Sequence, residues 1–192
     1  MTTFAHFALA ALCSAALILS PVAAAQAAKQ DHDHDHDHDH DHQHDTLGQR
    51  KHVHGAITFN IALEGETLAV ELDVPADNVV GFEKSPRNDA ERKAIADANA
   101  WLASGRNIAA VPRNAGCRLL SVDFAPPKFG SGHADYRARF AYRCPNPAAL
   151  DWVELPALSR LLEIDKVEVN VITASVQRQT ELAAGSTRVS LK

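Results

Sequence analysis

The first half of the folded region shows the alternation of apolar and polar residues that is typical of half-buried β-strands. Two such runs, residues 57–63 and 68–74, are separated by a short polar segment, and Pro75 ends the second run. This pattern predicts a β-hairpin. If Leu63 lies opposite Leu68, apolar residues face one another along the whole hairpin.

A helix is expected after the hairpin. Residues 90–103 are rich in Ala and carry apolar residues at helical spacing. Ser85 is a suitable cap, Pro86 suits the first helical position, and Gly105 ends the pattern. Trp101 falls on the apolar face, so it is interpreted as a core residue.

The second half of the chain returns to strand patterns. Strands are predicted at residues 118–124, 134–144, 164–174, 176–182 and 187–191, with a short helical segment at 156–162. The polar side of 134–144 is basic, which is typical of a solvated strand face, although a surface for an anion or a partner is an alternative. The fold class is therefore α+β: one domain, residues 52–192, with a mostly antiparallel β-sheet and one substantial helix.

The N-terminus has the features of an export signal. Residues 7–19 are uncharged and mostly apolar, and small residues follow them. This run is shorter than the roughly 20 residues that a membrane-spanning helix needs. We interpret residues 1–25 as a signal peptide, with cleavage after Ala25 or Ala27, and expect a periplasmic protein without stable membrane insertion after cleavage. An uncleaved anchor is the alternative.

A His/Asp arm, residues 26–51, follows the signal. Its tract 31–45 alternates seven His with seven Asp and contains no apolar residue, so it is expected to be disordered. The tract lowers the net charge by 7, and the rest of the chain is close to neutral. Because the rest of the chain is close to neutral, its charge gives no reason to expect nucleic-acid binding.

The histidines of the tract form the strongest chemical signal in the chain. In an extended chain, alternate side chains lie about 6.6 Å apart, so two imidazoles can share one ion. We expect the tract to bind several Zn²⁺ ions per chain, although Cu²⁺ and Ni²⁺ suit the same ligands. The alternative is that the tract is a solubilising spacer that binds no metal. The predicted ligands are His32, His34, His36, His38, His40, His42 and His44.

A second set of candidate ligands lies in the folded domain. His52 and His54 precede the hairpin on its polar side, and its register, if it extends outward, brings His54 near Asp77. His133 and Asp135 begin a later strand. These five residues would form a compact metal site if they converge, and a solvated His pair is an equally plausible interpretation.

Export removes Cys13 and leaves Cys117 and Cys144 in an oxidising compartment. A disulfide between these two cysteines is expected, and two separate buried thiols are the alternative.

Three segments together resemble the ZrgA family of periplasmic zinc-binding proteins: HVHG at 52–55, NVVGFE at 78–83, and HAD…YRC between 133 and 144. The resemblance covers His52 to Lys192. It implies a zinc-binding protein that supplies or buffers zinc for an importer, and it makes His52, His54 and His133 candidate ligands. Relatives often have His where this chain has Lys84, which implies a reduced or rebuilt site here.

The leading hypothesis is a non-enzymatic zinc-binding protein of zinc uptake or homeostasis, which works with metal ions and an importer component. A copper or nickel buffering protein has the same ligands. A metallohydrolase with a three-His zinc site at His52, His54 and His133 is the less favoured enzyme hypothesis, because no HExxH motif or nucleophile elbow is found.

Overall fold

The two alternating segments form the predicted hairpin in the computed structural model, which describes residues 53–130 and 132–192. The strands β1 (Ala56–Glu64) and β2 (Thr67–Pro75) pair antiparallel with Leu63 opposite Leu68, so the predicted register is confirmed. A slip of one residue would turn every core side chain to solvent, which explains why the pattern specifies the register. The expected signal peptide, the His/Asp arm and His52 lie outside the described residues.

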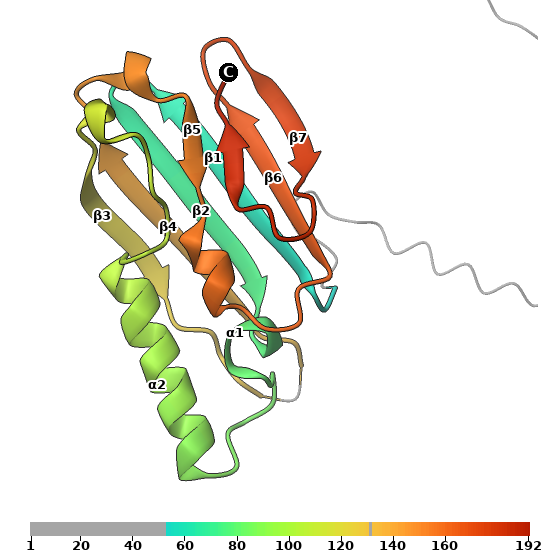
Figure 1. Cartoon of the computed structure of the whole chain (residues 1–192). Helices are drawn as coiled ribbons and strands as arrows, with labels where there is room; N and C mark the ends of the chain where they lie inside the picture. The colour runs from blue at the N-terminus through green and yellow to red at the C-terminus, as the bar shows by residue number, and fades with distance from the viewer. Residues whose placement is uncertain (1–52, 131) are drawn as a thin grey trace, which may run out of the picture. The chain divides into compact units, whose positions relative to one another are not determined.

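Four more strands extend the hairpin into a six-stranded sheet with the order β3-β4-β2-β1-β6-β7 (Figure 1). They are β3 (Arg118–Ala125), β4 (Asp135–Arg143), β6 (Lys166–Ile172) and β7 (Gln177–Glu181). Neighbouring strands are antiparallel except β1 and β6, which run parallel. The predicted class, a mostly antiparallel α+β domain, is confirmed.

Shorter elements cover one face of this sheet. They are α1 (Asp77–Val80), η1 (Arg113–Ala115), η2 (Pro147–Ala149), β5 (Trp152–Glu154), η3 (Pro156–Arg160) and β8 (Arg188–Ser190). β5 and β8 pair with each other, and Val153 and Val189 from these strands share one buried cluster with Phe59 and Phe140 of the large sheet. β8 lies within the predicted strand 187–191, whereas β5 was not predicted from the sequence.

The long helix α2 (Asp89–Ser104) starts later than predicted. Asn88 caps it by accepting a hydrogen bond from the Glu91 backbone N–H, and the Glu91 carboxylate accepts one from the backbone N–H of Arg87. This reciprocal arrangement leaves Ser85 and Pro86 outside the helix, so the predicted start is wrong. Gly105 ends the helix as expected. No helix in the described ranges is long and apolar enough to span a membrane.

The other face of the sheet is polar and exposed. The basic side of β4 lies beside acidic residues of the β1–β2 hairpin, in the pairs Arg137–Asp73, Arg139–Glu71 and Arg143–Glu66. Exposed pairs of this kind each stabilise a fold by about 0 to 1 kcal/mol. The basic residues are therefore largely balanced within the sheet, as expected for a solvated strand face.

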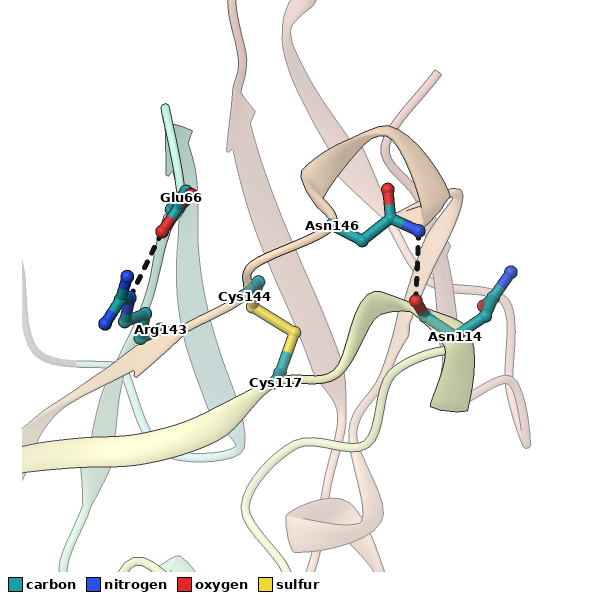
Figure 2. Close-up of a disulfide and its surroundings, with 6 residues drawn as sticks. All are labelled: Glu66, Asn114, Cys117, Arg143, Cys144 and Asn146. Atoms are coloured by element: carbon teal, nitrogen blue, oxygen red, sulfur yellow. Dashed lines mark hydrogen bonds and ion pairs between the residues drawn. A yellow bond between two sulfur atoms is a disulfide. The ribbon is translucent and has the colours of Figure 1, made fainter.

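The expected disulfide joins Cys117, just before β3, to Cys144, just after β4 (Figure 2). The backbone N–H of Cys144 also donates to the carbonyl of Glu66 in the hairpin turn, with 2.7 Å between N and O. The covalent bond and this hydrogen bond join three chain segments at one end of the sheet.

Candidate metal centre

The candidate ligands gather at the end of the sheet opposite the disulfide. β1 and β4 both run antiparallel to β2, so the starts of β1 and β4 lie at the same end as the finish of β2. His54 lies two residues before β1, His133 two residues before β4, and Asp77 two residues after β2. Strand topology alone therefore brings three polar segments together.

A tight turn at Gly55 positions His54. Gly55 has φ = +75°, and a Cβ atom there would lie 2.4 Å from the Asp165 carboxylate, so only glycine fits. Its N–H donates to the side-chain oxygen of buried Asn78, 3.1 Å away. The Asn78 amide group in turn donates to the carbonyls of Leu162 and Glu163, at 2.6 and 3.0 Å. Asn78 thus ties the turn before β1 to α1 and to the loop before β6.

Aromatic packing positions the segment that carries Glu83. Gly81 ends α1 in the left-handed conformation, with φ = +84°, and turns the chain toward Phe82 and Glu83. The ring of Phe82 packs on Phe129, with 5.7 Å between centroids, and Phe129 packs on buried Tyr136, at 6.2 Å. The loop that leads to His133 is therefore held against the loop that carries Glu83.

Three side chains converge at this point in a geometry suited to a metal ion. His133 Nδ1 lies 2.9 Å from Glu83 Oε2, and His54 Nε2 lies 3.9 Å from the same oxygen. One ligand atom from each residue lies within 4.8 Å of the other two. Tetrahedral ligands at zinc–ligand distances of 2.0 to 2.1 Å are about 3.3 Å apart, so small adjustments would seat the ion.

Asp77 orients His54 for this role. Asp77 Oδ2 is hydrogen-bonded to His54 Nδ1, while Asp77 Oδ1 accepts from the backbone N–H of Asn78 at 2.8 Å. The hydrogen bond and the charge of Asp77, with a smaller contribution from the charge of Glu83, raise the pKa of His54 above its ordinary value. A carboxylate on one ring nitrogen leaves the other nitrogen, Nε2, directed at the ion, an arrangement found in many metal sites.

The three residues line an open pocket of about 470 Å³. The side chains of His54 and His133 are 58% and 61% exposed, whereas that of Glu83 is only 10% exposed. The carboxylate is therefore at the base of the site and the imidazoles are at its mouth. An ion can reach all three side chains from solvent.

The structure brings together three of the residues that the sequence suggested, His54, Asp77 and His133. Asp135 is not in the cluster: its carboxylate lies 3.3 Å from the guanidinium of Arg137. His52 and the seven arm histidines lie outside the described residues. Sequence reasoning did not single out Glu83, because it lies in a loop without periodicity, and its only signal was its place in the NVVGFE segment.

Comparisons with known proteins give one finding. No curated protein matches the chain. The family described as "ZrgA family zinc uptake protein" matches residues 51–191, which is most of the chain and includes all of the described domain except its last residue. The chain therefore belongs to the ZrgA family of zinc uptake proteins.

Proposed function

We propose that this protein captures or buffers Zn²⁺ in the periplasm and supports its uptake by an importer. The observation that carries the proposal is the convergence of His54, Glu83 and His133 within 4.8 Å. Two imidazoles and a carboxylate are ligands that zinc accepts readily, and a carboxylate bonded to the other nitrogen of a ligating imidazole, as Asp77 is to His54, is typical of such sites. Zinc is here the cargo of the protein.

The arm and the domain have different tasks in this proposal. The arm offers many His-x-His pairs, and in this proposal it binds several ions, each with modest affinity. The domain offers a single site whose ligands are positioned by strands, by the Gly55 turn and by Asn78. The arm therefore provides capacity, and the domain provides the tighter site.

The carboxylates near the cluster support binding rather than catalysis. Asp77 is bonded to His54, and Glu91 forms an ion pair with Arg87 at 3.0 Å. Metallohydrolases of the two-His, one-Glu type use a further carboxylate as a general base for the zinc-bound water. Neither Asp77 nor Glu91 is available for that role, which supports a protein that binds zinc without transforming a substrate.

Isothermal titration with Zn²⁺ tests the proposal. The processed chain should bind several equivalents. A full-length variant with asparagine at the seven arm histidines, called the arm variant below, should keep a single tighter equivalent. Adding Glu83→Gln to the arm variant should remove that equivalent, whereas Glu64→Gln, which changes an exposed carboxylate at the far end of β1, should not.

Metal identity and location need two further measurements. Competition among Zn²⁺, Cu²⁺ and Ni²⁺ for the arm variant, together with protein levels under zinc starvation and copper excess, separates zinc uptake from copper buffering. Induction by excess copper alone would refute the zinc proposal. Cell fractionation with mass determination of the mature N-terminus tests export: a chain that keeps residues 1–25 in the cytoplasm contradicts it.

A further inference from the structure

The described residues supply three of the ligands that a zinc ion takes at this site. His54, Glu83 and His133 provide three ligand atoms, and zinc in proteins usually takes four. Asp77 is bonded to the far nitrogen of His54, so it acts behind that ligand rather than as a fourth one. The described residues thus leave a fourth position unfilled at the pocket of about 470 Å³ that the three ligands line, a volume in the range of small-molecule sites.

The wall of this pocket beyond the ligands carries basic as well as acidic side chains. Lys84, Ser85 and Arg87 line it together with the three metal ligands. Arg87 is paired with Glu91, whereas Lys84 has no ion-pair partner among residues 53–130 and 132–192. The Lys84 backbone is bridged to Gly130, so its position at the pocket is fixed by the fold.

Charge complementarity points to an anion. The lining residues Asp77, Glu83 and Glu91 are acidic, and Lys84 and Arg87 are basic, so the pocket carries one net negative charge when its histidines are neutral. A bound dication changes this to one net positive charge. The loaded pocket therefore attracts an anion that the empty pocket does not.

We propose that the loaded site binds a small carboxylate from solution, with one carboxylate oxygen on the metal ion and the anion's charge facing Lys84. This inference rests on the proposed function, because it requires the metal ion at His54, Glu83 and His133. Carboxylate oxygen is a ligand that zinc accepts, and a second carboxylate on the same molecule can reach the ammonium group of Lys84. The protein thus recognises zinc together with a di- or tricarboxylate.

The test uses Co²⁺ as a spectroscopic substitute for zinc in the arm variant, so that only the domain site is observed. Co²⁺ is added first, and its visible bands report the coordination of the ion. Succinate is then titrated into the loaded protein, and succinamide, which has the same size without charge, is titrated as the control ligand. Succinate should shift the bands with saturation, and succinamide should not.

Two lysine variants test the role of the pocket wall. Lys84→Gln should leave the Co²⁺ bands in the absence of succinate unchanged and weaken succinate binding about fivefold, the upper range for an exposed ion pair. Lys93→Gln is the matched control, because Lys93 is exposed on α2 and pairs with Asp97 outside the pocket. It should bind succinate like the parent protein.

The outcomes separate the two proposals. If the arm variant binds no Co²⁺ and no Zn²⁺, the proposed function of the domain site fails. If the metal binds but succinate leaves the bands unchanged, or succinamide acts equally well, the metal site stands and the carboxylate inference is overturned. Equal succinate affinities in the Lys84 and Lys93 variants also overturn it, since they remove the residue that recognises the anion.

Discussion

The bond between Asp77 and His54 sets how this site responds to pH. Because the pKa of His54 is raised, protons compete with zinc already above its ordinary value near 6.5. In the metal-free protein, the pair between protonated His54 and Asp77 stabilises the fold. This stabilisation is fully present below the pKa that His54 has in the unfolded chain, and it is lost as the pH rises through the raised pKa of His54 in the folded protein. A proton and a zinc ion therefore compete for His54.

Asp77→Asn tests this coupling. At pH 8 the variant should bind zinc about 10- to 100-fold more weakly, because His54 loses the carboxylate that orients it. The loss of affinity between pH 8 and pH 6 should be smaller than in the parent protein, since the pKa of His54 falls back toward its ordinary value. Titrations of the arm variant at both pH values measure this. Asp89→Asn, which changes an exposed residue of α2, is the control, and parallel pH curves for D77N and the parent would disprove the coupling.

The turn before β1 accepts only glycine at position 55. Gly55→Ala should lower the free energy of unfolding by about 3 kcal/mol or more, because a left-handed backbone and a contact with Asp165 both oppose the added methyl group. Gly65→Ala is a matched control: Gly65 also has positive φ, at +55°, but nothing lies within 4 Å of its Cβ position. It should cost about 1 kcal/mol. Urea unfolding followed by circular dichroism compares the two, and equal losses would show that the contact with Asp165 is unimportant.

At the level of elements, the disulfide should contribute to stability but not to metal binding. Cys117 and Cys144 join the two strands at the end of the sheet away from the metal site, across a sequence separation of 27. Replacing both with serine should lower the free energy of unfolding by about 3 kcal/mol. When both serine substitutions are added to the arm variant, its zinc affinity at 15 °C should change by no more than about twofold, because the end of the sheet that carries the disulfide positions no ligand. A large loss of affinity in a variant that is still folded would show that the two ends are coupled.

The sequence predicted elements well where local pattern decides the structure. The β1–β2 register follows from alternation alone, and it correctly brought His54 to Asp77 even though these residues lie beyond the paired strands. The parallel pairing of β1 with β6 could not be predicted, because more than 100 residues separate the paired positions and no local signal specifies them. The start of α2 was missed because several residues could cap it, and only the structure shows that Asn88 does.

The candidate ligands also divide into residues that the sequence could suggest and a residue that only the structure reveals. His54 and His133 stand out by residue type, so a sequence can propose them. Glu83 is one of many acidic residues, and only the folded structure shows that its carboxylate lies near both imidazoles. Asp135 was proposed because it follows His133 closely, but its carboxylate pairs with the guanidinium of Arg137 and does not join the cluster.

At the scale of the whole molecule, zinc in the domain should stabilise the fold, whereas zinc in the arm should not. An ion at His54, Glu83 and His133 bridges three segments that separate on unfolding, so it binds the native state selectively. At free zinc about 100-fold above the Kd, stability should rise by about 2.7 kcal/mol, or roughly 5 to 10 °C in Tm. The arm variant should show the full increase, and His133→Asn should lose it. Thermal scans measure this, and a shift that follows the arm rather than His133 would contradict the assignment.

The positions of the ligands along the chain have a consequence for how cargo leaves. His54 precedes β1 and His133 precedes β4, and β2 lies between these two strands in the sheet. A bound ion would therefore link the loops before β1 and β4 reversibly, whereas the disulfide links the opposite end of the sheet covalently. In the proposed function, we therefore expect release of the ion to require movement of the loops that carry Glu83 and His133 only, while the sheet and the disulfide stay unchanged.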